Sequence, residues 1–165
     1  MATAPLSPAR KSAWLVLAVC IVTVVGLGSL IGGLTSAGEG DWYRNLEKAP
    51  FNPPGYAFGI VWPFLYTFLG IAAWRIWRSD APSRNTALGL FGAQLIVNYS
   101  WSYIFFTLQL IAVGAIWIVA MIALAAMAMR AFFKIDRTAG WLMAPYMAWI
   151  SFAFVLTASI WLLNP

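Results

Sequence analysis

Residues 13–34 read AWLVLAVCIVTVVGLGSLIGGL, a run that contains no charged side chain. About 20 apolar residues are enough for a helix to cross the hydrocarbon core of a membrane. Arg10 and Lys11 precede the run, as in a secretory signal peptide, but the apolar core of a cleaved signal is only about 7–15 residues long. The run therefore predicts a retained membrane helix over residues 13–34, after an amino tail over residues 1–12. Cleavage as a signal peptide is the alternative.

Four more apolar runs follow along the chain, over residues 55–77, 86–107, 110–133 and 140–163. Almost nothing separates the second of these from the third, which predicts an antiparallel hairpin. The chain has 165 residues, of which 62% are hydrophobic and 9% are charged, whereas a soluble domain carries charge on about a quarter of its residues. The mean hydropathy is +0.81. We predict an all-α integral membrane protein, a five-transmembrane-helix bundle that forms one domain over residues 13–165.

The cations are unevenly divided between the two ends of this predicted bundle. The amino tail and the connections after the second and fourth runs hold eight of the ten Lys and Arg residues, and the first loop holds Arg44 and Lys48. Cytoplasmic loops of membrane proteins carry an excess of Lys and Arg. We therefore expect a cytoplasmic amino terminus and an external carboxyl terminus, while inner and outer membranes stay open. The net charge of +5 is thus a topology signal and does not indicate nucleic-acid binding.

Several kinds of functional group are absent or isolated. The chain has no His, its single Cys20 lies in an apolar run, and no charge lies near the centre of a predicted helix. Pumps, proton relays and voltage sensors need ionisable groups inside the membrane, so the sequence argues against those classes. It also offers no catalytic acid–base pair, no activated nucleophile and no metal site. The expected ligand is apolar and flat, and not a bare ion.

Aromatic and amide side chains recur at helical spacing on three of the runs. The three stripes are Phe58, Trp62 and Tyr66; Gln94, Asn98, Trp101 and Phe105; and Tyr146, Trp149, Ala153 and Thr157. An unsatisfied amide in hydrocarbon costs several kcal/mol, so Gln94 and Asn98 must face protein or a cavity. These amides could simply join neighbouring helices. Three stripes with polar tips favour a pocket lined by ring faces.

The loop over residues 35–54 is unusually rich in rings and prolines. Residues 41–54 read DWYRNLEKAPFNPP, which predicts a lid folded over the mouth of the bundle.

Small residues give two close-packing motifs, Gly28 with Gly32 and Gly89 with Ala93. We expect one motif to serve internal packing, and the other could form a homodimer.

The residues that carry a family resemblance run in order along the chain. They are Trp42, Tyr43, Leu46 and Lys48, the segment 51–55, Phe58, Val61, Trp62, Leu65, Tyr66, Gln94, Asn98, Trp101, Phe105, Phe106, Asp136, Pro145, Tyr146, Trp149, Phe152, Ala153, Leu163 and Asn164. Together they resemble the TspO/MBR family, which comprises the translocator proteins and the tryptophan-rich sensory proteins. The resemblance covers residues 13–164, and the ordered set is specific although no single residue is.

This resemblance implies a five-helix bundle, usually dimeric, that binds tetrapyrroles such as protoporphyrin IX. It also implies sterols and benzodiazepine-type ligands as further partners, and roles as a receptor, stress regulator or transporter. The pocket that it implies consists of Trp42, Tyr43, Trp62, Tyr66, Asn98, Trp101, Tyr146, Trp149 and Ala153. Some bacterial relatives promote light- and oxygen-dependent breakdown of protoporphyrin, for which Trp42 and Trp149 are the candidate residues here.

Two departures from the family pattern concern the lid and the sterol motif, and the absence of His concerns haem binding. The family often has Pro directly after the loop Lys, where this chain has Ala49, and residues 156–165 lack the Tyr and Lys/Arg of a proposed sterol motif. Arg44 and Lys48 at the rim could pair with porphyrin carboxylates. Without His, an iron porphyrin has no good axial ligand, so we expect the free-base ring to be preferred over haem.

Overall fold

The computed structural model describes residues 8–38 and 40–165, and every regular element in that part of the chain is helical. The long helices are α1 (Pro8–Leu34), α3 (Tyr56–Trp77), α4 (Arg84–Ser102), α5 (Ile111–Ile135) and α7 (Ala144–Leu163); the shorter elements are α2 (Asp41–Asn45), the π-helical turn η1 (Tyr103–Thr107) and α6 (Arg137–Leu142). Residues 1–7 of the expected cytoplasmic tail, and Glu39 of the first loop, lie outside the described residues.

Four helical segments are long and apolar enough to cross a membrane: Ala13–Leu34, Tyr56–Trp77, Ile111–Ile135, and α6 with α7 over Arg137–Leu163. The chain is thus an integral, multi-pass membrane protein. Helix α4 does not reach the same standard, because polar residues such as Gln94 and Asn98 lower its hydropathy. The predicted five crossings are therefore not established by helix length and hydropathy alone.

Local chemistry explains several helix ends. The Asp136 carboxylate accepts hydrogen bonds from the backbone N–H groups of Thr138 (2.8 Å) and Ala139 (3.1 Å), which caps the start of α6. Pro145 lies in the first turn of α7, where its missing N–H costs nothing. Gly38, after α1, has a φ of 85°, a conformation that favours glycine.

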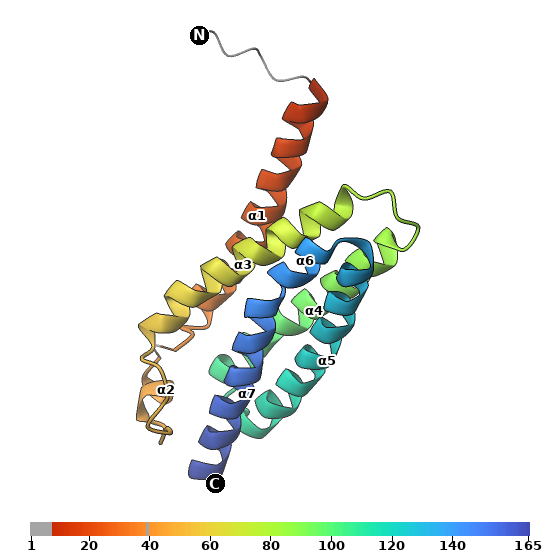
Figure 1. Cartoon of the computed structure of the whole chain (residues 1–165). Coiled ribbons are helices and arrows are strands. Elements are labelled where there is room, and N and C mark those ends of the chain that lie inside the picture. The colour runs from red at the N-terminus through yellow and green to blue at the C-terminus, as the bar shows by residue number, and fades with distance from the viewer. Residues whose placement is uncertain (1–7, 39) are drawn as a thin grey trace.

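The helices pack as antiparallel neighbours, with α5 between α4 and α7 and with α1 against α3 (Figure 1). The amino-terminal part of α1 projects beyond the other helices, whereas its carboxyl-terminal part lies alongside α3 (Figure 1). Gly70 allows this contact, because a Cβ on Gly70 would come within 2.9 Å of the backbone of Ile21. Helices α1 and α3 thus form a closely packed pair, which contacts the other helices mainly through α4 and α6.

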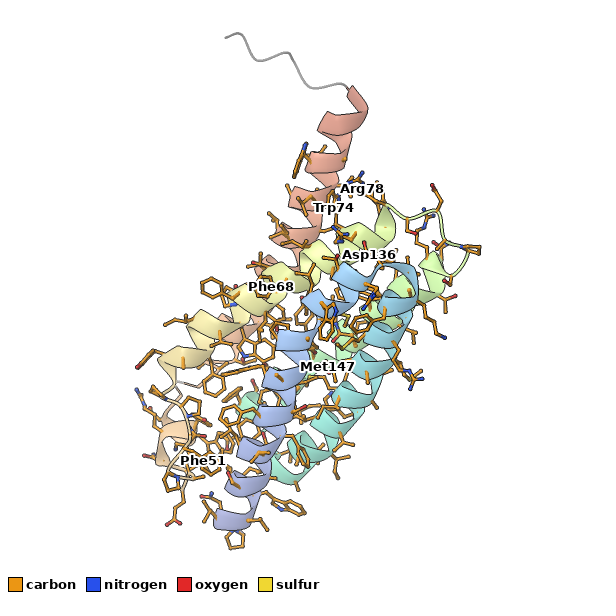
Figure 2. The ribbon with its side chains drawn as sticks, in the orientation of Figure 1. Phe51, Phe68, Trp74, Arg78, Asp136 and Met147 are labelled. Atoms are coloured by element: carbon orange, nitrogen blue, oxygen red, sulfur yellow. The ribbon has the colours of Figure 1, made fainter. Side chains whose placement is uncertain are left out.

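The two ends of the bundle carry different features. Trp74, Arg78 and Asp136 lie together at one end, where the Arg75 Nε and Nη2 atoms are each 2.8 Å from Asp136 Oδ2 (Figure 2). This ion pair ties the end of α3 to the turn between α5 and α6. The first loop, which includes Phe51 and α2, lies at the opposite end, next to the carboxyl end of α7 (Figures 1 and 2).

Candidate ligand site

A cavity of about 550 Å³ lies between α1, α3 and the junction of α4 with η1, at the end of the bundle that carries the first loop. Five aromatic side chains line it: Phe58, Trp62, Tyr66, Trp101 and Phe106. Its other walls are glycine, serine, proline and alanine, and none of the described residues that line it is charged. The cavity therefore suits an uncharged, largely apolar group with flat faces.

Glycines provide the width of this cavity on the α1 and α3 sides. Gly32, Gly33 and Gly59 line it, and a Cβ built on any of them would meet no atom within 4 Å. Gly28 has a different role, because a Cβ there would overlap the ring of Tyr66. The Gly28–Gly32 motif thus serves helix packing at one position and open space at the other.

The ring positions in the wall are fixed by hydrogen bonds to buried groups behind them. The Tyr66 hydroxyl donates to Asn98 Oδ1 at 2.7 Å, and the Trp101 Nε1–H donates to the carbonyl of Gly114 at 3.1 Å. Trp101 also stacks on Phe105 with ring centroids 5.1 Å apart. The cavity wall is therefore pre-organised, which lowers the entropic cost of binding.

Gln94 and Asn98 join helices and do not line the cavity. Gln94 Oε1 accepts from the Tyr146 hydroxyl at 2.7 Å, and Asn98 Nδ2 lies 3.3 Å from the sulfur of Met121. Gln94 is 0% exposed and Asn98 is 3% exposed, so both amides face protein, as expected from the cost of exposing them to lipid. The Gln94 Nε2 group has no partner within the described residues.

Part of the predicted site lies in the core next to the cavity. Trp149 is half-buried, packs edge-on against Trp62 with ring centroids 6.4 Å apart, and lines neither the large cavity nor the smaller one described next. A second cavity of only about 10 Å³ lies deeper in the bundle and shares Phe58, Trp101 and Phe106 with the large one. The predicted residues Tyr43, Phe105 and Ala153 line this small space.

The first loop closes the end of the bundle with aromatic rings. The side chain of Tyr43 in α2 is 4% exposed and packs edge-on against Phe58 and Phe106, with centroids 6.2 and 5.4 Å away. The neighbouring Trp42 packs against Phe105 at 5.5 Å. Burial raises the pKa of the Tyr43 phenol, and a hydrogen bond with Asn52 offsets part of this rise. Residues 41–54, here called the lid, thus place a neutral ring inside the bundle.

The two rim cations are already engaged within the lid. Lys48 Nζ donates to the carbonyls of Tyr43 (2.6 Å), Arg44 (3.1 Å) and Leu46 (2.7 Å), which caps the carboxyl end of α2. Partial burial lowers the pKa of this ammonium group. Arg44 pairs with Asp41 on the exposed side of α2. All three Lys48 protons have acceptors, so Arg44 is the rim cation with N–H groups left to offer an anion.

Sequence reasoning found four of the wall residues, Phe58, Trp62, Tyr66 and Trp101, and missed the α1 wall. The other lining residues, which were not predicted as part of the site, are Gly28, Ser29, Gly32 and Gly33 of α1, Ser36 and Ala37 after it, and Gly55, Gly59, Pro63, Ser102 and Phe106. Glycines in an apolar helix indicate close packing as readily as open space, so the sequence could not distinguish the two.

Within the described residues, no three His, Cys, Asp or Glu side chains lie close enough together to hold a metal ion.

The sequence of the chain is similar to those of one protein family and of several named proteins. The sequence profile of the TspO/MBR family matches residues 14–162. The translocator protein of Bos taurus is 30% identical over 148 residues, which cover 87% of this chain and 88% of that protein. The tryptophan-rich protein TspO of Chlorobaculum tepidum is 32% identical over 155 residues, or 92% and 97% of the two chains. The tryptophan-rich sensory protein of Cereibacter sphaeroides is 34% identical over 124 residues, or 75% and 77%.

Proposed function

The chain belongs to the TspO/MBR family, and from this premise we propose that it binds porphyrins, protoporphyrin IX foremost, and other flat hydrophobic ligands. The observation that carries the proposal is the 550 Å³ cavity, which has aromatic side chains on its walls and no charge among its described lining residues. Aromatic rings stack on a flat π-system in offset or edge-on geometry, and each such pair adds about 0.5–1.5 kcal/mol beyond burial. The biological role that fits is tetrapyrrole or stress regulation, or transport.

The polar edge of a porphyrin also has a place to go. A hollow of about 270 Å³ beside the lid is lined by Arg44, Lys48 and Asn52, and Gly55 lines both this hollow and the aromatic cavity. We propose that the ring enters the aromatic cavity while its carboxylates stay at this wet rim, near Arg44. Exposed ion pairs contribute only about 0–1 kcal/mol, so the rim orients the ligand more than it holds it.

A titration of the purified protein with protoporphyrin IX, followed by quenching of Trp fluorescence, tests the proposal. Gly32→Leu places a side chain in the cavity, and Gly26→Leu is the matched control, because Gly26 lies on the same helix with open space around it but does not line the cavity. We expect Gly32→Leu to weaken binding about tenfold or more, which is about 1.4 kcal/mol, and Gly26→Leu to bind like the wild type. Equal binding by both variants would place the ligand elsewhere.

We also propose that α4 and η1 form a fifth crossing, with the amino terminus cytoplasmic and the carboxyl terminus outside. The continuous helical path over residues 84–107 is long enough to span. The amides that lower its hydropathy are buried, so they do not meet lipid. Single cysteines placed at Ser83 and Gln109 in a Cys20→Ser background would test this, because opposite labelling from the two sides of the membrane is expected. Labelling of both from one side would contradict it.

Homodimerisation through α4 is a further proposal. Gly89 is exposed, and a Cβ there would meet no atom within 4 Å, so the surface around Gly89 and Ala93 can accept a close helix contact. Gly89→Leu is expected to shift the protein from dimer to monomer in light scattering. An unchanged mass would contradict an interface at this position.

Light-driven breakdown of the bound porphyrin is the second candidate, and one contact favours it. Trp149 lies 6.4 Å from the cavity residue Trp62, close enough to relay an electron when porphyrin, light and oxygen are present. Trp149→Phe is expected to slow the loss of the Soret band under aerobic illumination while binding is retained. Loss no faster than with serum albumin would argue against this activity.

A further inference from the structure

One side chain joins the carboxyl end of α7 to the lid. Asn164, directly after α7, accepts a hydrogen bond from the Glu47 backbone N–H through Oδ1 at 3.0 Å. Its Nδ2 group donates to the Glu47 carbonyl at 2.9 Å and to the Ile160 carbonyl at 2.8 Å. The amide thus makes a reciprocal pair of hydrogen bonds with one lid residue and a third with its own helix, across 117 positions of sequence.

This contact is the polar attachment of the lid to the bundle. Within the described residues, the other hydrogen bonds of residues 41–54 are internal to the lid or lie at its two junctions with the adjoining chain. The remaining attachment is apolar, through the rings of Trp42 and Tyr43. Apolar contacts are non-directional, so they retain the rings in the bundle without fixing the register of the lid.

The lid and the ligand cavity are linked through Tyr43. Its ring lines the small inner cavity, and Phe58, Trp101 and Phe106 alone are shared between that cavity and the large one. Glu47 lies four residues after Tyr43, and Lys48 ties the intervening turn together through the carbonyls of Tyr43 and Leu46. Movement of Glu47 away from α7 would therefore carry Tyr43 with it and enlarge the inner space, which shares the rings of Phe58, Trp101 and Phe106 with the large cavity.

We infer that Asn164 is a latch: it holds the lid closed, and its release sets the rate at which the cavity exchanges its ligand. Asparagine suits this task because it supplies one acceptor and two donors on one short side chain. The inference that Asn164 helps to hold the lid closed is drawn from its hydrogen bonds and does not depend on the ligand. The inference that it controls ligand exchange rests on the proposed function. Asn164 would act as a positioning residue, since it lines neither cavity.

Hydrogen exchange of the full-length protein without ligand tests the latch. In Asn164→Ala, the backbone amides of residues 42–49, Glu47 included, and of Phe51 should exchange about threefold to tenfold faster, as expected from the loss of two hydrogen bonds. Asn164→Asp keeps an acceptor for the Glu47 N–H and loses the donors, so an intermediate increase is expected. Asn85→Ala, at the opposite end of the bundle, is the matched control and should leave lid exchange unchanged.

Two results would overturn the latch. Unchanged lid exchange in Asn164→Ala would show that the rings alone hold the lid. Equal acceleration in the lid and in the middle of α3 and α5 would show general destabilisation. Because both results are obtained without ligand, they decide the latch even if protoporphyrin IX fails to bind the wild type, which would count against the proposed function alone.

The rate of protoporphyrin IX release, measured by stopped flow, tests the second half of the inference. Asn164→Ala is expected to raise both the association and dissociation rates about threefold or more, with a smaller change in their ratio. Faster hydrogen exchange of the lid amides, with unchanged rates of ligand association and dissociation, would mean that the ligand does not pass the lid. That result would overturn the role assigned to Asn164 in ligand exchange.

Discussion

Where α1 crosses α3, one glycine decides how close the two helices come. The ring of Tyr66 occupies the position where a side chain on Gly28 would begin, and the Tyr66 hydroxyl is tied to Asn98 at 2.7 Å. The ring therefore has little freedom to move aside. Gly28 is buried, whereas Gly26 on the same helix is exposed with open space around it.

Gly28→Ala is therefore expected to destabilise the protein by about 1–3 kcal/mol, the usual cost of overpacking a core. Gly26→Ala, the matched control, should be neutral or slightly stabilising, because alanine is the better helix former. Thermal unfolding in detergent, followed by near-ultraviolet circular dichroism, compares the two variants. Equal melting temperatures would mean that Tyr66 can leave its position at little cost.

Two tryptophans of the predicted site hold different positions, so their replacement should change porphyrin binding by different amounts. Trp62 lines the large cavity, whereas Trp149 packs edge-on against Trp62 and does not line that cavity. Trp62→Ala is expected to raise the dissociation constant of protoporphyrin IX about tenfold or more, because a stacking partner and its buried area are lost. Trp149→Phe keeps a ring next to Trp62 and should change the constant less than about threefold. Fluorescence titration of both variants gives the comparison, and the reverse order would place the ligand in the inner core.

At the scale of elements, the Arg75–Asp136 pair connects α3 to the turn between α5 and α6. Burial alone would raise the pKa of Asp136, but the hydrogen bond from Ala139, the hydrogen bond and charge of Arg75, and the hydrogen bond from Thr138 lower it below the ordinary 3.8. A carboxylate with a lowered folded-state pKa contributes stability that is present above its unfolded-state pKa. That contribution is lost as the pH falls below about 4.

Replacement of Asp136 should reveal two separate contributions. Asp136→Asn retains a good cap for α6 and loses the charge, whereas Asp136→Ala also loses the cap, which is worth about 1 kcal/mol. At pH 7 we expect the melting temperature to fall in the order wild type, Asn, Ala, with about 2–4 °C per kcal/mol. The Asn variant should depend less on pH between 3 and 5 than the wild type. Asp80→Asn is the control, since Asp80 has no ion-pair partner within the described residues.

Element positions were largely predictable because apolar runs bounded by charges and prolines give a strong signal. The runs predicted over 110–133 and 55–77 correspond to α5 over Ile111–Ile135 and α3 over Tyr56–Trp77. The fifth run was predicted over 140–163, but the helix breaks at Met143, between α6 and α7. The cap at Asp136 starts α6, and neither it nor the break changes the hydrophobic pattern, so hydropathy could not locate them.

At the scale of the whole molecule, the sequence predicted which rings converge but not where space remains. Periodicity identifies residues that share a helix face. It does not say which neighbour fills that face. Here Tyr43 of the lid occupies part of the inner space, and the large cavity lies toward α1, where Gly32 and Gly33 leave room. These outcomes depend on contacts between segments distant in sequence, as does the Asn164–Glu47 pair.

The composition of the whole chain also argues against axial ligation of a bound metalloporphyrin. The chain has no His. Among the described residues that line the large cavity there is no sulfur ligand, and the one phenol, Tyr66, already donates to Asn98. Iron in a bound haem would therefore lack the axial ligand that usually fixes it in proteins. We expect free-base protoporphyrin IX to bind at least as tightly as haem, and the haem spectrum to show no protein-derived axial ligand. Parallel titrations with the two porphyrins, read by fluorescence quenching and by the Soret band, make the comparison. Tighter haem binding with a ligated spectrum would require Tyr66 or a residue outside the cavity wall to reach the iron, and the wall would then have to rearrange on binding.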